Sequence, residues 1–275
     1  ISGNKATTVG KYEVSIEPKD GVQNYDGRAT TLWSIVAADA QTFSIELSNA
    51  SLVYDGNEQK PTVTVKDGET VLVENTDYTI SYTNNVNVGT ATITATGLGN
   101  YTGTQTKEFS ITQADMTISA PTAISGLVYT TQPQTLANAG TVKGGEMFYS
   151  LDNQTWSKTI PTGIDAKEYT IYYKIEADAN HKAVEPSSFK VTIDKADLTS
   201  MSLAETNFIY NQLEREAQVV YVNAGTIVVP AESYEVTGNK ATTVGNYTAK
   251  VTGKGNFKGE VTTAWSIVAA NAQLF

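Results

Sequence analysis

The chain has 275 residues, and its 29 acidic and 19 basic side chains give it a formal charge of −10. An acidic chain repels phosphate, which argues against nucleic-acid binding, and no apolar run approaches the roughly 20 residues that span a membrane. Cysteine is absent and histidine occurs once, which excludes a disulfide framework, a thiolate zinc site and a His-rich metal centre.

The first 43 residues closely repeat the end of the chain. Residues 3–10 read GNKATTVG, as do residues 238–245, and WSIVAA occurs at 33–38 and again at 265–270. We interpret 1–43 as the C-terminal half of a module whose opening half is missing, with about three strands. Three strands cannot close a sandwich. Either the chain is cut from a longer array, or another copy completes the half-module by strand exchange.

Three complete modules are predicted after it, at 44–115, 116–195 and 196–275. The pattern Ile-x-x-Ala-Asp/Asn closes each module and the half-module before them; it begins at Ile35, Ile111, Ile193 and Ile267. A period of about 75–80 residues exceeds that of helical solenoid repeats and suits a small sandwich domain. The short Ala-Asp junctions predict little independent motion between modules.

Inside each module the apolar residues alternate with small polar ones. Residues 62–65, 78–82 and 90–94 show this period of two, and Asp55-Gly56 and Asp67-Gly68 separate such runs as turns. Alternation of this kind is typical of strands with one buried face. We predict about seven short strands in each complete module and an all-β fold.

Two long stretches carry a family resemblance. Residues 54–111, beginning YDGNEQKPTVTV and ending GTQTKEFSI, resemble bacterial cell-surface Ig-like β-sandwich repeats. Residues 127–193, with GGEMFYSLDNQTWSKTIPTGIDAKEYTIYYKIEADANHK, look like a sister type that occurs beside the first in large cell-wall proteins. The resemblance implies a tandem array in a secreted or wall-attached bacterial protein, acting as a stalk or adhesin segment. It brings no catalytic residues, and module 1–43 departs from the family pattern by lacking its opening half.

The single histidine and two of the tryptophans are best explained by packing. His181 aligns with Tyr101 and Phe257 of the other modules, so we interpret it as a partly packed loop residue and not as a catalyst. Trp33 and Trp265 occupy a slot that holds Phe109 and Val191 elsewhere, two residues before the repeated Ile. A slot shared by these apolar residues in a terminal strand predicts a core position.

Trp156 is the one aromatic residue that favours a ligand. It follows Asp152-Asn153-Gln154-Thr155 at a predicted hairpin and has no counterpart in the other modules. Indole faces stack on sugar rings, so Trp156 is a candidate ligand contact together with Tyr149. The alternative is that Trp156 packs on its own hairpin against Tyr149.

Other chemistry has weaker support in the sequence. The acidic residues are scattered through turns and strand ends, and three small sandwiches leave little chain for the cleft of a glycosidase. Asp55-Gly56-Asn57 and Asp115 are conceivable calcium ligands, although both serve equally well as turn and junction residues. A Lys–Asn isopeptide cross-link needs burial, which a sequence does not reveal. We therefore expect no catalytic residue, no metal site and no cofactor.

These observations predict a non-enzymatic, extracellular spacer that presents another domain away from a bacterial cell. Three modules in line would span roughly 100–120 Å, from strands of 6–8 residues at about 3.3 Å per residue plus end loops. Its expected partners are neighbouring modules of a longer parent chain, with no nucleic acid and no membrane insertion. The alternative function is an adhesin or carbohydrate-binding module that recognises a glycan or a matrix protein through loops of module 116–195.

Overall fold

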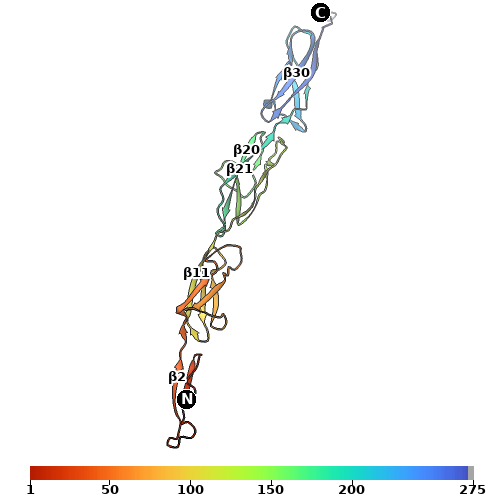
Figure 1. Cartoon of the computed structure of the whole chain (residues 1–275). Helices are drawn as coiled ribbons and strands as arrows, with labels where there is room; N and C mark the ends of the chain where they lie inside the picture. Colours follow the sequence, from red (N-terminus) through yellow and green to blue (C-terminus); the bar gives the residue numbers. More distant parts are fainter. Residues whose placement is uncertain (272–275) are drawn as a thin grey trace. The chain divides into compact units, whose positions relative to one another are not determined.

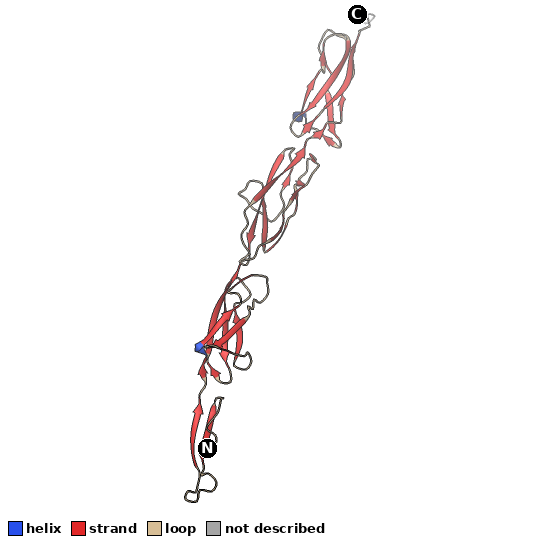
Figure 2. Ribbon diagram, viewed as in Figure 1, coloured by secondary structure: helices blue, strands red, loops and turns tan. Residues whose placement is uncertain are grey.

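The structure, a computed structural model, describes residues 1–271; the last four residues of the predicted 196–275 module lie outside the described part. Regular structure consists of strands, with only two single-turn 3-10 helices in the described residues, η1 (Ala40–Thr42) and η2 (Ala231–Ser233) (Figure 2). The predicted all-β fold is confirmed. Neither helix is long or apolar enough to cross a lipid bilayer.

Contacts between residues divide the chain into two compact units. Unit 1 contains Ile1–Met116 and the short loop Ala177–Lys182, and unit 2 contains Thr117–Glu176 and Ala183–Phe275. The boundaries of the four modules stay a prediction. We refer to the four stretches as segments 1–43, 44–115, 116–195 and 196–275.

Segment 1–43 forms a single long hairpin in unit 1. Its antiparallel strands are β1 (Gly10–Ile16) and β2 (Ala29–Ile35, labelled in Figure 1), paired from Gly10 with Ile35 to Ile16 with Ala29. The short strand β3 (Ala38–Asp39) leaves this hairpin and pairs in parallel with the next segment. Within residues 1–271 these two strands form a two-stranded sheet of their own, and Ile16 on one face of it is 55% exposed.

Segment 44–115 contains two sheets around one core. Its strands are β4 (Phe43–Leu47), β5 (Ser51–Val53), β6 (Val63–Asp67), β7 (Thr70–Val71), β8 (Tyr78–Thr83), β9 (Gly89–Gly97), β10 (Tyr101–Thr102) and β11 (Thr104–Thr112). One sheet has the order β5-β11-β9-β8 and the other β4-β6-β7. The alternation predicted for β9 puts Ala91, Ile93 and Ala95 inside, each 0% exposed.

Segment 116–195 repeats the larger sheet and has a more irregular second layer. Its strands are β12 (Thr117–Ser119), β13 (Thr122–Ala123), β14 (Leu127–Val128), β15 (Gln134–Thr135), β16 (Ala137–Asn138), β17 (Thr141–Lys143), β18 (Gly145–Ser150), β19 (Thr162–Gly163), β20 (Glu168–Ala177) and β21 (Ser187–Asp194). The large sheet has the order β14-β21-β20-β18, and the remaining strands form three two-stranded pairs. Leu136, Ile171 and Ile193 lie at the centre of the core.

Segment 196–275 returns to the arrangement of segment 44–115. Its strands are β22 (Ala196–Asp197), β23 (Ser200–Leu203), β24 (Asn207–Ile209), β25 (Arg215–Glu216), β26 (Val219–Ala224), β27 (Ile227–Val228), β28 (Tyr234–Thr237), β29 (Lys240–Ala241), β30 (Gly245–Gly253), β31 (Phe257–Lys258) and β32 (Glu260–Val268). The main sheets are β24-β32-β30-β28 and β23-β26-β27.

The same sheet plan therefore occurs three times. In each large sheet a short strand pairs in parallel with the last long strand, as β5 does with β11, β14 with β21 and β24 with β32. That last strand pairs antiparallel with the preceding long strand, which is β9, β20 or β30. A four-stranded sheet that faces a smaller sheet across a shared core is an Ig-like β-sandwich.

Candidate functional site

The same loop contact recurs three times and is the most regular polar feature of the chain. Before its last long strand, each of the three larger segments has an asparagine followed by an aromatic residue; these pairs are Asn100-Tyr101, Asn180-His181 and Asn256-Phe257. In each loop both the side chain and the backbone carbonyl of the asparagine accept hydrogen bonds. The donors are backbone N–H groups of residues that lie earlier in the chain.

Asn100 makes this contact between segments 1–43 and 44–115, inside unit 1. Its Oδ1 accepts from the backbone N–H of Val9 at 2.8 Å, and its carbonyl oxygen accepts from the N–H of Ala38 at 2.9 Å. The next residue begins β10, which pairs in parallel with β3. Tyr101 packs edge-on against Phe43, with 5.2 Å between ring centroids. The side chain of Asn100 thus accepts from a loop N–H group, while its backbone carbonyl extends the pairing of β3 with β10.

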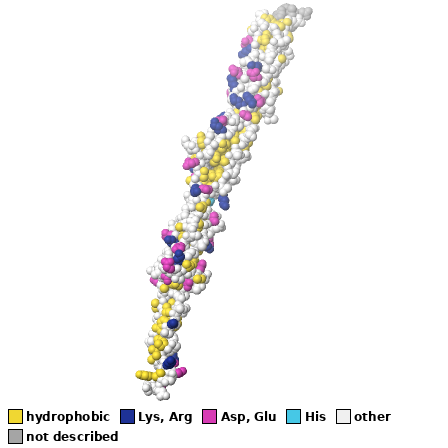
Figure 3. All heavy atoms as spheres, in the orientation of Figure 1, with side chains coloured by type: hydrophobic (Ala, Val, Ile, Leu, Met, Phe, Trp, Pro, Cys, Tyr) yellow, Lys and Arg dark blue, Asp and Glu magenta, His cyan; other side chains and the backbone are white. Residues whose placement is uncertain are grey.

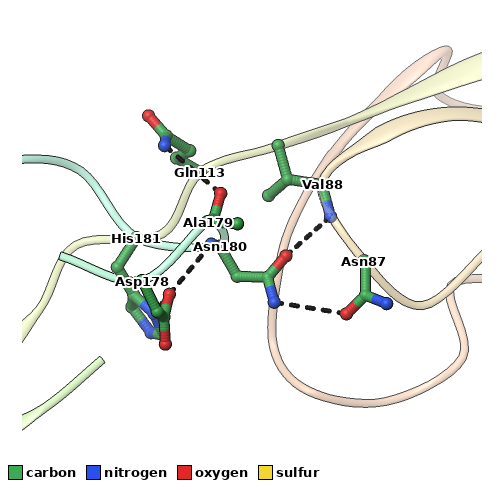
Figure 4. Close-up of polar contacts among 7 residues, drawn as sticks. All are labelled: Asn87, Val88, Gln113, Asp178, Ala179, Asn180 and His181. Atoms are coloured by element: carbon green, nitrogen blue, oxygen red, sulfur yellow. Dashed lines mark hydrogen bonds and ion pairs between the residues drawn. The ribbon is translucent and has the colours of Figure 1, made fainter. Parts of the chain in front are cut away.

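Asn180 makes the same contacts in the loop 177–182 of unit 1 (Figure 4). Its Oδ1 accepts from the N–H of Val88 at 2.9 Å, and its Nδ2 donates to Oδ1 of Asn87 at 3.2 Å. Its carbonyl oxygen accepts from the N–H of Ala114 at 3.0 Å. Gln113 adds a bond from Nε2 to the carbonyl of Ala179 at 3.3 Å (Figure 4).

His181 shapes this loop. Its Nδ1 lies 2.7 Å from Oδ1 of Asp178, and its ring meets Tyr54 edge-on at 5.5 Å, so that its side chain is only 12% exposed. The hydrogen bond with His181 holds the pKa of the Asp178 carboxyl below its ordinary value, and the backbone N–H of Asn180 acts in the same direction. The contacts with Asp178 and Tyr54 both engage the imidazole in packing and in the structure of the loop.

Asn256 completes the series inside unit 2. Its Oδ1 accepts from the N–H of Ala166 at 2.8 Å, its Nδ2 donates to Asp165 at 3.1 Å, and its carbonyl accepts from the N–H of Ala196 at 3.0 Å. Phe257 packs edge-on against Tyr129 at 5.3 Å. Tyr129 is the counterpart of Tyr54, because both donate their N–H to the residue after the last strand's repeated Ile.

Glycine makes the tight return of these loops possible. Gly103 and Gly259 follow the strands β10 and β31 with φ of +84° and +82°, a region that side chains disfavour. A Cβ on Gly103 would lie 2.9 Å from Oδ1 of Asp39, the residue that caps the neighbouring turn. The sequence pattern Asn-aromatic-x-Gly thus encodes the loop at 100–103 and at 256–259.

The structure separates the two tryptophans that share a sequence motif. Trp265 is 2% exposed and lies in a cluster with Leu203, Ala217 and Ile267. Its copy, Trp33, is only half-buried. The core prediction is therefore right for Trp265 and wrong for Trp33, because segment 1–43 has no facing sheet to cover its tryptophan.

Trp156 and Tyr149 occupy different environments in the 149–157 hairpin. Tyr149 is 4% exposed and belongs to the core, where its hydroxyl donates to Sδ of Met147 and accepts from the N–H of Gly140. Trp156 is half-buried, with Nζ of Lys174 5.1 Å from its ring centroid. A hollow of about 470 Å³ beside the hairpin is lined by Tyr149 but not by Trp156. The ligand-contacting role of both residues stays a prediction.

The hairpin turn itself is held by Asp152. Its Oδ1 accepts from the N–H groups of Thr155 at 2.7 Å and Gln154 at 2.8 Å and from the hydroxyl of Ser150 at 2.8 Å. The bonds from Thr155, Gln154 and Ser150 lower the pKa of this carboxyl strongly. The turn predicted at residues 152–155 is thus held by the ionised carboxylate of Asp152.

The conceivable calcium ligands have other partners. Oδ1 of Asp55 accepts from the N–H of Asn57 at 2.8 Å, and Asp115 pairs with Lys182 at 2.8 Å. Within residues 1–271 no three acidic or histidine side chains cluster as metal ligands. The same described residues include no buried lysine that could form an isopeptide bond.

Sequence reasoning missed the role of Asn100, Asn180 and Asn256. A signal was present, because the asparagine precedes an aromatic residue in each complete module and a glycine follows two positions later in two of them. In the sequence, the three asparagines occupy equivalent positions of three similar modules, and this equivalence does not indicate their hydrogen-bond partners. Only the tertiary structure shows that the partner of each asparagine belongs to the stretch before it.

Comparisons with known proteins identify no family. No protein-family model matches the chain, and no curated protein matches it in sequence. Among solved structures, a chain of the complex of Dpr2 Ig1-Ig2 with DIP-Theta Ig1-Ig3 is 12% identical, with a TM-score of 0.27, covering 83% of this chain and 99% of that one. The protocadherin gammaB7 EC3-6 cis-dimer is also 12% identical, with a TM-score of 0.28, covering 95% of this chain and 85% of that one. Similarity at this level supports no conclusion about function.

Proposed function

We propose that the chain is a non-enzymatic spacer of a secreted or wall-attached bacterial surface protein, holding another domain away from the cell. The observation that supports this is the threefold recurrence of the asparagine-aromatic loop. A spacer needs joints that resist bending. Each of these loops combines a side-chain hydrogen bond, a backbone hydrogen bond and an edge-on aromatic contact.

Each part of the loop contact restricts a different motion. The hydrogen bond that the asparagine carbonyl accepts continues a short parallel strand pair, β3 with β10 or β22 with β31. It thereby fixes the direction of the connecting peptide. Oδ1 accepts from a second N–H group, which belongs to Val9, Val88 or Ala166. In each loop this second donor lies about 30 residues before the donor that binds the asparagine carbonyl. Two attachment points on one loop oppose both bending and twisting.

The N-terminal hairpin carries a further copy of the loop pattern. Asn24-Tyr25-Asp26-Gly27 in segment 1–43 matches Asn100-Tyr101-Thr102-Gly103, and Tyr25 is 77% exposed. Tyr210 is the counterpart of Tyr54 and Tyr129 in segment 196–275. Both elements fit neighbouring modules of the same kind as partners, as a longer array requires.

Small-angle X-ray scattering of the whole chain tests the spacer. We expect a maximum dimension no shorter than the roughly 100–120 Å of three modules in line, and a sharp distribution of distances. The triple variant Asn100→Ala, Asn180→Ala, Asn256→Ala should shorten and broaden that distribution. The control is Asn246→Ala, which removes an exposed asparagine from β30. A wild-type chain that scatters as freely jointed beads, unchanged by the triple variant, would contradict the proposal.

A second candidate function is ligand recognition by segment 116–195. The observation that favours it is the cluster of Phe148, Trp156 and Lys174, in which Nζ of one lysine lies over two aromatic rings. Binding of the chain to glycan and matrix-protein arrays tests it. A hit that Trp156→Ala abolishes and Tyr221→Ala preserves would support an adhesin. Tyr221 is the matched control because it is a 46% exposed aromatic residue of another segment.

A further inference from the structure

In the large sheet of each sandwich, the first and the last strand lie side by side and run in the same direction. These pairs are β5 with β11, β14 with β21 and β24 with β32, and we call them the terminal clamps. The chain enters a parallel pair at one end of one strand and leaves it at the opposite end of the other. Tension along the chain therefore slides the two strands past each other and loads all their hydrogen bonds together. An antiparallel terminal pair would open one bond at a time.

The terminal clamps of segments 44–115 and 196–275 are closely alike. Each has three paired residues on both strands, Ser51–Val53 with Ser110–Thr112 and Asn207–Ile209 with Ser266–Val268. A further backbone bond of 2.8–2.9 Å flanks each clamp at both ends: from Ser110 to Ala50 and from Tyr54 to Thr112 in the first, and from Ser266 to Thr206 and from Tyr210 to Val268 in the second.

The terminal clamp of segment 116–195 is shorter. Its paired residues are Leu127–Val128 and Ile193–Asp194. Within residues 1–271 a flanking bond is present at one end only, where the N–H of Tyr129 donates to the carbonyl of Asp194 at 2.9 Å. In the same described range no side-chain hydrogen bond joins β14 to β21. Hydroxyl groups cross the other two clamps, from Thr112 to Leu52 at 3.1 Å and from Ser266 to Asn207 at 2.9 Å.

The strands that lead into the clamps show the same difference. β4 pairs with β6 over five residues and β23 with β26 over four. Segment 116–195 has two separate patches instead, β12 with β17 over three residues and β13 with β16 over two. Separate short patches break one after the other, so they resist tension less than one continuous ladder does.

Ion pairs do not remove this difference. Lys, Arg, Asp and Glu side chains lie at the surface of the chain (Figure 3), where exposed pairs contribute little. Lys190 pairs with Glu168 at 2.7 Å, which joins β21 to β20 and not to β14. Lys250 pairs with Glu260 at 3.0 Å, which joins β30 to β32. The resistance of each sandwich to tension therefore depends on its strand pairs.

We propose that segment 116–195 is the extensible element of the chain under tension. Its terminal clamp breaks first, and this sandwich unfolds while segments 44–115 and 196–275 stay folded. Breaking the clamp frees the residues from Leu127 to Asp194, which is roughly 220–245 Å of chain at full extension. The inference rests on the proposed spacer function, because a spacer between a cell and the domain that it presents is pulled from both ends.

Pulling single molecules of the whole chain by its two ends tests the proposal, because forced unfolding reports how fast each clamp opens. Variants with two cysteines identify the segment that opens, since the chain has no cysteine of its own. Val128→Cys with Asp194→Cys puts two thiols on exposed register partners of the 116–195 clamp, within reach of a disulfide. Val53→Cys with Thr112→Cys is the matched control at the same position of the 44–115 clamp.

In the natural chain we expect the event at the lowest force to release roughly 220–245 Å. The disulfide between positions 128 and 194 should abolish this event, and its reduction should restore the event in the same variant. The disulfide between positions 53 and 112 should leave the first event unchanged and remove a later one. Ile209→Cys with Val268→Cys gives a second control, in segment 196–275. A first event that survives the 128–194 disulfide, or that either control disulfide abolishes, would overturn the proposal.

The pulling experiment and the scattering experiment fail separately. A chain that scatters as freely jointed beads would contradict the spacer and leave the measured order of unfolding as it is. A chain that passes the scattering test but in which segment 44–115 or segment 196–275 opens first would contradict the extensible element and leave the spacer intact.

Discussion

The β1–β2 hairpin and the β30–β32 hairpin share sequence and local geometry but not surroundings. Tyr12 and Trp33 have ring centroids 4.9 Å apart at 32°, and Tyr247 and Trp265 have the same values. Each tyrosine hydroxyl also donates to the carbonyl of a threonine four residues earlier, Thr8 or Thr243. The hairpin geometry is thus complete without a facing sheet.

Burial is where the two hairpins differ. Tyr25 is 77% exposed and Phe257, at the equivalent loop position, is 2% exposed. The residues that cover Trp265 and most of those that cover Phe257 come from the first half of segment 196–275. Among the described residues no second sheet packs on the β1–β2 hairpin. Local contacts therefore set the shape of the hairpin, while distant residues set its stability.

The largest expected effect separates the two tryptophans. Trp265→Ala should lower the free energy of unfolding by about 3–5 kcal/mol, as large-to-small changes in a core do. Trp33→Ala should cost less than about 1 kcal/mol, because much of that side chain already contacts water. Urea titrations followed by circular dichroism measure both values. Equal losses would show that the N-terminal hairpin is buried in solution.

The second test concerns a feature that both hairpins share. A Cβ on Gly3 would lie 2.0 Å from the carbonyl oxygen of Glu13, and one on Gly238 would lie 2.3 Å from that of Thr248. Both glycines also have positive φ. Gly3→Ala and Gly238→Ala should each cost at least about 1–2 kcal/mol locally and speed amide exchange in the hairpin that they precede. A large effect at only one position would end the claim of shared local geometry.

The third test compares the loop asparagines of the two hairpins. Asn256→Ala removes an acceptor from the N–H of Ala166, which should cost about 1 kcal/mol and speed exchange of that amide about fivefold. Asn24→Ala should leave protection unchanged elsewhere, because Asn24 is exposed at the hairpin tip. Nuclear magnetic resonance of exchanging amides resolves the two sites. Slow exchange of the amide hydrogens around Asn24 would contradict this expectation and would indicate that the loop contacts another surface in solution.

The smallest effect is a dependence on pH. Hydrogen bonds from Lys250 and Thr252 lower the pKa of Glu260 in β32, whereas the matching position of the first hairpin holds Arg28. A lowered pKa stabilises the folded state above about pH 4.3, the unfolded value, and the contribution is lost as pH falls through the folded pKa. Lys250→Met should flatten this acid-side slope for segment 196–275. An unchanged slope would show that the pair contributes nothing in solution.

Much of the fold could be read from the order of residues. The alternation in residues 90–94 predicted a strand with one buried face, which is β9 with Ala91 and Ile93 inside. The repeat of GNKATTVG and WSIVAA predicted that segment 1–43 copies the end of the chain, and the β1–β2 and β30–β32 ladders share their register. The joint contacts could not be read in this way. Asn180 bonds to Val88, which is 92 positions away, and no local pattern states which distant N–H group an asparagine will meet.

By itself, the sequence determined the strands, the turns and the repeated hairpin, because period-two burial and glycines at positive φ act over a few residues. It also determined the Tyr-Trp contact, which forms between directly paired residues of one ladder. The tertiary structure alone decided that Trp265 is buried while Trp33 is only half-buried, and that Asn100, Asn180 and Asn256 accept hydrogen bonds from N–H groups about 90 residues earlier in the chain. The physical reason is that burial and long-range hydrogen bonds depend on which surfaces meet, and two segments with closely similar sequences can meet different surfaces.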